Sequence, residues 1–338
     1  MDSSTDDGLT KRIAETLGAR VVSIGKQGLG KAYIDSVDQI KGDYVIMGDA
    51  DGTYDFMEMD RFTRKMDNGY DFVMGTRLKG DIKPGAMPWS HRYIGTPTLT
   101  FFINLFFRAG ISDCNSGLRA LTIEAFRKMK LESWGWEYAS EMVIKGVLCN
   151  LKMTEVPVSL TPDRNDRKPH LNPFAAGWSN LRYIMLLASE FIFLKLGAVI
   201  SILGLIVLLS QLFGPVTLGA HTFGTYYLFL GVILTNIGFS ILQMGIITQN
   251  FSYLKDFRVN RISNYIRENF RFERGLIIGA GLFLVGFSID LFVLLQWLSY
   301  GVIDTNDFRL GIYALFFIIS GIQSIYFSFV FYLFNRYR

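Results

Sequence analysis

The stretch that decides the fold of the first half of the chain is YVIMGDADGTYD, residues 44–55. Its opening residues, Tyr44–Met47, form a short apolar run typical of a buried strand. Two carboxylates separated by one residue, Asp49 and Asp51, follow directly. Ligands of α/β sheets bind beyond the carboxyl ends of the strands, and paired carboxylates there can converge on one hard cation. The stretch therefore predicts an α/β sheet with a Mg²⁺ or Mn²⁺ site at Asp49 and Asp51.

Around this stretch, strand-like runs alternate with helical patterns. Such alternation predicts an α/β domain with a largely parallel sheet. Besides residues 44–47, the expected strands cover residues 20–24, 71–76 and 152–160, and the expected helices cover residues 28–40, 56–68, 98–109, 123–129 and 136–150.

The second half of the chain has a different composition. The whole chain of 338 residues is 50% hydrophobic and 19% charged, but residues 190–338 hold only 10 Lys and Arg and 7 Asp and Glu. Four apolar stretches there are long enough to cross a bilayer as helices. The sequence thus predicts a soluble domain (1–170), an interfacial helix (171–189) and an α-helical membrane domain (190–338) with four spans at about residues 191–213, 223–247, 275–298 and 310–334.

The net charge argues against one class of partner, and the distribution of basic residues predicts how the chain is oriented in the membrane. The net charge of +4 is too small to suggest a broad basic face for nucleic acid. Six of the basic residues lie in the loop 255–274, between the second and third spans. The positive-inside rule then predicts that the soluble domain and both termini are cytoplasmic. Asp290 lies inside the third span, where a charge is costly, and both a functional and a bundle-facing role are open.

A glycine-rich segment precedes the expected helix 28–40. Its GxxxxGK spacing, from Gly25 to Lys31, is that of a phosphate loop, but Ala32 replaces the hydroxyl residue that such loops use for Mg²⁺. Backbone N–H groups at a helix start can still bind a phosphate. Gly28, Gly30 and Lys31 are therefore predicted to bind a phosphorylated donor, with a simple turn into the helix as the alternative.

Several basic side chains are candidates for phosphate contact, because arginine matches phosphate with two parallel donors. Arg77 follows the expected strand 71–76, and Arg119 ends the segment DCNSGLR, which begins at Asp113. Each alone is also compatible with a surface ion pair. A basic loop before the interfacial helix is predicted to meet lipid phosphates through Arg164, Arg167 and Lys168. Glu137, Glu141 and Lys145 share one helical face and predict an intrahelical salt-bridge ladder.

Five segments in one order resemble a known family: VIMGDADGTYDF, VMGTRLKG, ISDCNSGLRAL, EYASEMVIK and RKPHLNPFAAGW. They are similar to the inverting family-2 glycosyltransferases with the GT-A (Rossmann-like) fold, especially the polyprenyl-phosphate and dolichyl-phosphate sugar synthases of the dolichyl-phosphate glucose synthase type. The resemblance implies transfer of a sugar from a nucleotide-sugar, UDP-glucose first, to a polyprenyl or dolichyl phosphate.

The resemblance also implies roles for residues. Asp49 and Asp51 match the motif that holds the metal and the donor diphosphate, and Arg77 and Arg119 match positions that contact the acceptor phosphate. Because that phosphate is already anionic, a strong general base is less necessary. The implied catalytic residues are Asp51, Arg77, Arg119 and Asp113, with Glu141 as a further orienting group.

The family pattern begins with a strand that this sequence does not contain. The chain opens inside the family's second motif, with Asp2 as a donor-binding acid, so the resemblance implies an N-terminally truncated domain. A misplaced start codon, a fragment and a pseudoenzyme are the three explanations. Two other functions stay open: a processive polysaccharide synthase, whose Gln-x-x-Arg-Trp motif is absent here, and a non-catalytic membrane scaffold. Expected partners are the two substrates and membrane lipids, with a homo-oligomer possible and no nucleic acid.

Overall fold

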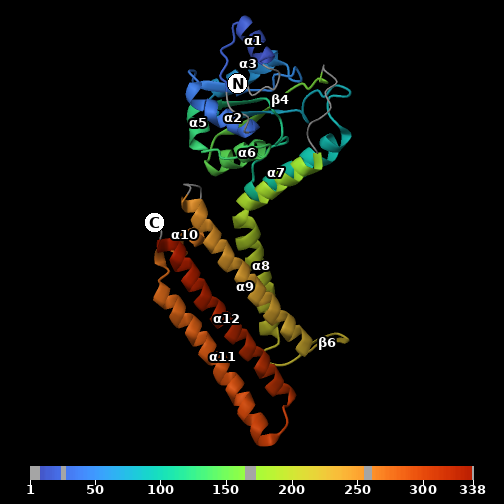
Figure 1. Cartoon of the computed structure of the whole chain (residues 1–338). Helices are drawn as coiled ribbons and strands as arrows, with labels where there is room; N and C mark the ends of the chain where they lie inside the picture. Colours follow the sequence, from blue (N-terminus) through green and yellow to red (C-terminus); the bar gives the residue numbers. More distant parts are fainter. Residues whose placement is uncertain (1–7, 24–27, 164–172, 255–260, 337–338) are drawn as a thin grey trace. The chain divides into compact units, whose positions relative to one another are not determined.

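The structure is a computed structural model that describes residues 8–23, 28–163, 173–254 and 261–336 (Figure 1). The chain forms two compact units, Met1–Ala188 and Ser189–Arg338. The first is an α/β domain with a mixed parallel and antiparallel sheet, and the second is built from long helices.

The sheet of the first unit has four strands in the order β1-β3-β2-β4. They are β1 (Tyr44–Met47), β2 (Phe72–Thr76), β3 (Arg119–Thr122) and β4 (Met153–Pro157). β3 runs antiparallel to both β1 and β2, whereas β2 and β4 are parallel. The α/β class is confirmed, but the expectation of a largely parallel sheet is wrong, because a reversed strand lies in the middle.

The sheet differs from the prediction at two strands: one expected strand is not formed, and one strand was not expected. Residues 20–23, the described part of the expected strand 20–24, form no strand, and only Ser23 makes an isolated bridge. Val21 and Val22 are only partly buried, and Arg20 and Ser23 on either side are exposed, so this apolar run does not pack into a core as a buried strand would. β3, in contrast, was not predicted. It has only four residues and passes directly into a helix whose N-cap is Thr122.

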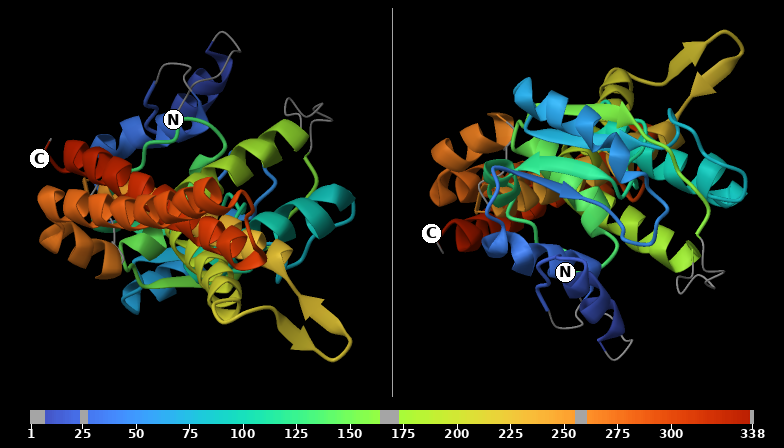
Figure 2. Two further views of the ribbon diagram at one scale, coloured as in Figure 1. Left: turned by 90° about the horizontal axis from the view of Figure 1, so that it is seen from below. Right: turned by 90° about the horizontal axis from the view of Figure 1, so that it is seen from above.

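Helices cover both faces of the sheet (Figure 2). Along β2 the side chains alternate: Phe72 and Met74 pack into one core with α4 and α6, and Val73 packs into a second core with α3. This alternation is the period of two expected of a strand buried on both sides. The helices are α1 (Leu9–Thr16), α2 (Leu29–Ser36), α3 (Met59–Asp67), α4 (Thr96–Phe107), α5 (Ile123–Lys128), α6 (Tyr138–Leu148) and α7 (Pro173–Leu187).

Among its described residues, the second unit contains four helices that are long and apolar enough to cross a membrane: Phe191–Ser210, Thr225–Gln249, Phe272–Tyr300 and Thr305–Phe334. This confirms the four predicted spans by length and composition. A π-helical turn (Glu190–Lys195) leads into α8, and a small hairpin joins α8 to α9. The elements are α8 (Leu196–Ser210), β5 (Val216–Leu218), β6 (His221–Phe223), α9 (Thr225–Leu254), α10 (Arg261–Asn269), α11 (Phe272–Tyr300) and α12 (Thr305–Arg336).

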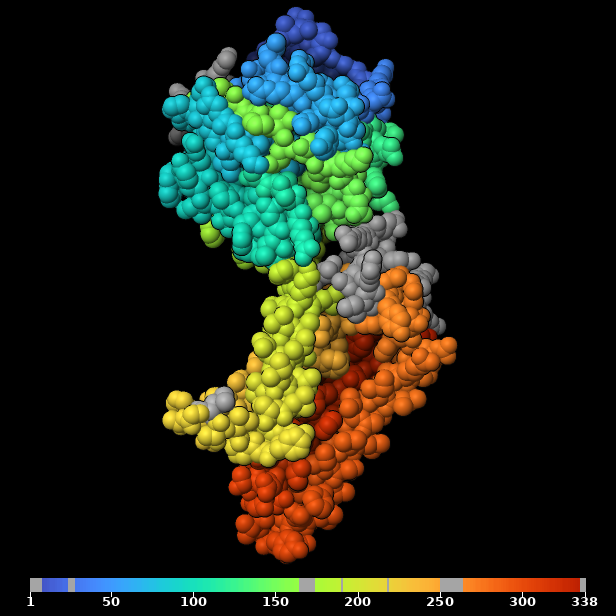
Figure 3. All heavy atoms as spheres, turned by 180° about the vertical axis from the view of Figure 1, so that it is seen from behind, coloured from blue at the N-terminus to red at the C-terminus, as the bar shows by residue number. Residues whose placement is uncertain are grey.

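Glycines let the helices of this unit approach closely in two pairs. A Cβ atom on Gly204 of α8 would lie 2.3 Å from the backbone N of Thr235 in α9. In the α11–α12 pair, a Cβ on Gly321 would lie 2.6 Å from the backbone N of Phe283. Figure 3 shows α11 and α12, in orange and red, packed against each other. Small residues at such contacts are typical of membrane helices. The structure thus contains two tightly packed helical hairpins.

Polar side chains join the two hairpins. Ser320 of α12 donates to Asn236 of α9 at 3.2 Å, and Gln323 donates to Ser240 at 2.9 Å. The side chain of Asp290 is exposed on α11 rather than turned into the bundle.

Candidate functional site

The candidate site lies at the edge of the sheet where β1 and β2 end and β3 begins. Because β3 is antiparallel to both neighbours, its first residue, Arg119, pairs in register with Met47 of β1 and Met74 of β2. The loop before β3 therefore meets the residues that follow β1 and β2. This reversal brings the carboxylates after β1, Arg77 after β2 and the segment 113–118 to one place.

The centre of this edge is a buried ion pair between Arg77 and Asp113. Arg77 Nε donates to Asp113 Oδ2 at 2.7 Å and its Nη2 donates to Oδ1 at 2.9 Å. The Asp113 side chain is fully buried, and that of Arg77 is 13% exposed. Burial alone would lower the pKa of Arg77, but the hydrogen bonds and charge of Asp113 raise it. Arg77 is therefore a permanently charged group held in one orientation.

The Asp113 carboxylate is already occupied by these contacts. Its Oδ2 also accepts from the backbone N of Arg77 at 3.0 Å, and its Oδ1 accepts from the backbone N of Asn115 at 3.1 Å. A carboxylate with four donors and no exposed surface is poorly placed to accept a proton from a substrate. Asp113 thus orients Arg77, which fits the predicted orienting role rather than an acid–base role.

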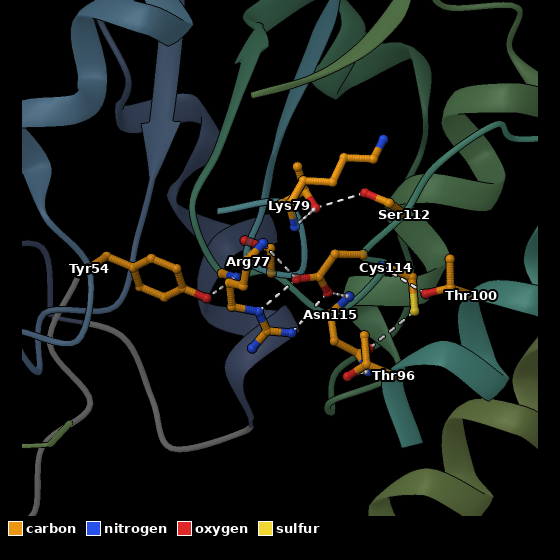
Figure 4. Close-up of polar contacts among 12 residues, drawn as sticks. Tyr54, Arg77, Lys79, Thr96, Thr100, Ser112, Cys114 and Asn115 are labelled. Atoms are coloured by element: carbon orange, nitrogen blue, oxygen red, sulfur yellow. Dashed lines mark hydrogen bonds and ion pairs between the residues drawn. The ribbon is translucent and has the colours of Figure 1, made fainter. Parts of the chain in front are cut away.

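Further contacts fix the loop that carries Asp113. In Figure 4, Arg77, Cys114 and Asn115 lie between Tyr54 on one side and Thr96 and Thr100 on the other. The backbone N of Cys114 donates to Thr100 at 3.2 Å. On β4, Glu155 accepts from the backbone N and the hydroxyl of Ser112 at 2.6 and 2.7 Å. Glu155 was not predicted as a site residue, because a lone glutamate in a strand belongs to no motif.

Arg119 is deeply buried and braces the same loop. Its Nε, Nη1 and Nη2 atoms donate to the carbonyls of Ser116, Ala139 and Cys114, each at 2.8 Å. Burial lowers the pKa of the guanidinium. Since only 3% of the residue is exposed, this geometry favours a positioning role over the direct phosphate contact that the resemblance implied.

Asp49 and Asp51 follow β1 as predicted. Asp51 is exposed, and its Oδ1 accepts from the backbone N and hydroxyl of Thr53 at 2.9 and 2.7 Å. Asp49 is half-buried, and burial together with the charge of Asp51 raises its pKa, although Arg119 and Arg77 oppose this rise. Gly117 leaves room for the Asp49 carboxylate, since a Cβ there would lie 2.5 Å from Oδ2.

This carboxylate pair fits a divalent cation that is shared with a substrate. Burial and the neighbouring Asp51 charge oppose ionisation of Asp49, and a positive ion between the two side chains would favour its charged form. Within the described ranges, no group of three or more His, Cys, Asp and Glu side chains is placed to hold a metal. A cation at Asp49 and Asp51 would therefore complete its shell with water and substrate oxygens, as Mg²⁺ usually does.

The glycine-rich segment has a packing role in the structure. The backbone N–H groups of Gly30 and Lys31 donate to the carbonyl of Trp134, at 3.0 and 3.4 Å. Lys31 forms an ion pair with Asp35. These donors are already used within the chain, so the alternative of a turn into a helix describes Gly28, Gly30 and Lys31 better than donor binding does. Four other predicted site residues lie outside the described residues: Asp2, Arg164, Arg167 and Lys168.

We expect Gly30→Ala to destabilise the protein by about 1–3 kcal/mol, the usual range for overpacking a core. A Cβ at position 30 would lie 2.1 Å from the carbonyl oxygen of Ser133, so α2 would have to move. Thermal unfolding of the two proteins measures the effect. Gly177→Ala in α7 is the matched control, because nothing lies within 4 Å of its Cβ position. Equal stability of Gly30→Ala and the wild type would contradict the packing role.

Glu141 is the second buried carboxylate near this edge. As predicted, it pairs with Lys145 one helical turn away, with 2.7 Å between Oε1 and Nζ. The pair is not on the surface: 0% of the Glu141 side chain and 1% of the Lys145 side chain are exposed. Burial would raise the pKa of Glu141, but Lys145 and the backbone N–H groups of Ser133 and Glu132 hold it below its ordinary value.

An apolar surface lies on the helices α4 and α7 and the π-helical turn before α4, His91–Gly95. α4 and α7 are in contact within the first unit. Large apolar side chains are exposed on these elements and just before the π-helical turn: Trp89, Tyr93, Phe101, Phe174, Trp178 and Leu186. Exposed tryptophan and tyrosine beside aliphatic residues are typical of the interfacial layer of a membrane.

Comparisons with known proteins match both halves of the chain to models of the same family. Residues 1–130 match the model "Glycosyl transferase family 2", and residues 246–335 match "Glycosyltransferase family 2 C-terminal transmembrane region". The chain is 32% identical over 330 residues to the low-salt glycan biosynthesis hexosyltransferase Agl6 of Haloferax volcanii, a match that covers 97% of this chain and 79% of that protein.

Two further relatives match over about half of this chain or less. A dolichyl-phosphate hexose transferase of Haloferax volcanii is 28% identical over 51% of this chain and 72% of its own length. The polyprenol monophosphomannose synthase of Mycolicibacterium smegmatis is 27% identical over 40% of this chain and 53% of its own length.

Proposed function

Because this chain belongs to glycosyltransferase family 2, we propose that it transfers a hexose from a nucleotide-sugar to a polyprenyl or dolichyl phosphate in the membrane. The observation that carries the proposal is the sheet edge, where Arg77 is held by Asp113 close to the paired carboxylates Asp49 and Asp51. The reaction needs one site for the diphosphate of the donor and one for the monophosphate of the acceptor. A bound cation would provide the first, and an oriented arginine would provide the second.

Each residue at the edge has a role in the proposed reaction. Asp49 and Asp51 would hold Mg²⁺ or Mn²⁺, which neutralises the charge that develops on the leaving nucleotide diphosphate. The Nη1 side of the Arg77 guanidinium faces no partner among the described residues and is free to bind the acceptor phosphate. Asp113 keeps the guanidinium in place, and Arg119 braces the loop.

The proposed chemistry needs no proton transfer at the start. An oxygen of the acceptor phosphate attacks the anomeric carbon, and the bond from that carbon to the diphosphate oxygen breaks. The leaving nucleotide diphosphate takes the electron pair, and the configuration at the carbon inverts. Since the attacking oxygen is already anionic, the fully bonded Asp113 and Glu141 are not needed as bases.

Two features support a lipid acceptor. The chain continues from α7 into four candidate membrane spans, and α4 and α7 expose aromatic side chains. The relatives also include proteins named for dolichyl phosphate and polyprenol. With six basic residues in the loop 255–274, we further propose that the first unit faces the cytoplasm. UDP-glucose is the first donor to test.

The test is an assay on membranes that contain the full chain. UDP-glucose and other labelled nucleotide-sugars are supplied with polyprenyl phosphate and Mg²⁺ or Mn²⁺, and the lipid product is measured. We expect a lipid-linked hexose that depends on the acceptor, disappears with a chelator and returns when the metal is restored. The absence of product with every donor, in membranes that hold folded protein, would refute the proposal and leave the scaffold alternative.

A further inference from the structure

The first turn of α6 contacts two separate parts of the candidate site. The ring of Tyr138 stacks on Tyr33 of α2, with 5.4 Å between the ring centroids and 8° between the planes. The next residue, Ala139, accepts a hydrogen bond from Arg119 Nη1 at 2.8 Å. Tyr33 is also near enough to Asp49 for the two side chains to interact electrostatically. A displacement of α6 would therefore move groups on both sides of the site.

The following two residues of α6 bind α7. Ser140 Oγ donates to Asn180 Oδ1 at 2.8 Å, and the Tyr183 hydroxyl donates to Glu141 Oε1 at 2.9 Å. Ser140 and Glu141 are fully buried, and Asn180 is 6% exposed. Two hydrogen bonds one helical turn apart on α7 thus hold it against consecutive residues of α6.

Glu141 also reaches a third segment. Its two oxygens accept from the backbone N–H groups of Glu132 and Ser133, at 3.0 and 2.8 Å. The next residue, Trp134, accepts from the backbone N of Gly30 at the start of α2. One carboxylate therefore joins α7, α6 and the loop against which α2 packs.

We propose that Glu141 and Tyr183 are positioning residues that couple α7 to the active-site edge of the first unit. α7 ends at Leu187, and the helix that enters the first candidate span begins at Glu190. A shift of α7 would move Glu141 and the first turn of α6, and through them Arg119 and α2. The inference rests on the proposed sugar transfer and adds that the transfer depends on how α7 is held.

A positional role has a physical basis, because small displacements of groups at a reaction centre have large effects on the rate. A displacement of about 1 Å can lower a rate by about 100-fold. The Tyr183 hydroxyl is one donor among four on the Glu141 carboxylate, so its removal should loosen α7 without unfolding α6.

Tyr183→Phe tests the proposal, because it removes one hydroxyl and keeps the ring. We expect kcat for sugar transfer, measured per folded enzyme at saturating donor and acceptor, to fall about tenfold. The KM for the nucleotide-sugar should change less than about twofold, since the donor carboxylates are untouched. Tyr226→Phe in α9 is the matched control, because Tyr226 is 90% exposed, and it should behave as the wild type.

Asn180→Ala removes the other α6–α7 bond and should lower kcat in the same direction. A lower unfolding temperature with unchanged kcat in both variants would overturn the proposal, because that is the signature of a merely structural contact. A raised donor KM with unchanged kcat would overturn it as well. If the unaltered chain forms no lipid-linked sugar, the proposed function itself fails, and this inference with it.

Discussion

Asp49→Asn is expected to lower kcat/KM for sugar transfer by about 10²–10³-fold, the size of effect seen when a group that stabilises developing charge is removed. The substitution keeps the size of the side chain and removes its charge. Asp49 and Asp51 are the only pair proposed to hold the cation, and an amide is a much weaker ligand for a hard cation than a carboxylate. The loss should be partly reversed at high metal concentration, because metal binding is what has been weakened.

The same substitution should leave stability unchanged or raise it. The pKa of Asp49 is raised by burial and by the charge of Asp51, so the ionised side chain opposes folding above its folded-state pKa. Removing the charge removes that repulsion. Asp60→Asn is the control, because Asp60 has an 84% exposed side chain on α3 and should keep full activity. A variant at position 49 with normal activity, or one that loses activity only by unfolding, would contradict the metal role.

Asp113→Asn is expected to reduce both stability and activity. Breaking one partner of a buried ion pair typically costs about 3–5 kcal/mol, because the other charge remains buried without compensation. Arg77, with 13% of its side chain exposed, would keep some contact with water, so we expect the lower end of that range. The activity of the remaining folded protein should fall about 100-fold as Arg77 loses its fixed orientation.

Two companion variants separate these effects. Arg77→Lys retains the positive charge but not the two parallel donors, so it should lose activity to a similar extent and less stability. Asp81→Asn removes one partner of an exposed pair with Lys83 and should change stability by no more than about 0.5 kcal/mol. Unfolding curves and kcat, both corrected for folded fraction, are the measurements. Full activity of folded Asp113→Asn would show that the orientation of Arg77 does not matter.

The sequence predicted those parts of the fold whose signal is local. β1 was placed at residues 44–47, and the starts of α2 and α4, at residues 29 and 96, lie within two residues of the predicted starts at 28 and 98. The four spans were predictable because each carries a long apolar run. Asp49 and Asp51 were found because they follow a strand directly, and strand ends are where α/β sheets bind ligands.

The missed parts depend on contacts between residues far apart in the chain. β3 is short, and only its pairing with β1 and β2 defines it as a strand. Asp113 was predicted as a site residue from its motif alone, and nothing in the sequence indicates that it pairs with Arg77, 36 residues away. Arg119 was predicted to contact the acceptor phosphate, with a surface ion pair as the alternative, and its burial depends on distant backbone carbonyls such as that of Ala139, which accept its hydrogen bonds. Gly28 and Gly30 were predicted to bind a phosphorylated donor, with a turn into the helix as the alternative, because close backbone packing and phosphate binding both favour residues without a Cβ.

The two glycine-packed hairpins of the second unit have a consequence for biosynthesis. In each hairpin the close contacts join helices that are neighbours in the chain, such as Gly204 with Thr235 and Gly321 with Phe283. Contacts between sequence neighbours form fastest, and chains fold from the N-terminus during synthesis. The α8–α9 hairpin can therefore assemble in the membrane before α11 has been translated. The hydrogen bonds of Ser320 and Gln323 to α9 then form last, when the α11–α12 hairpin docks on the α8–α9 hairpin that has already assembled.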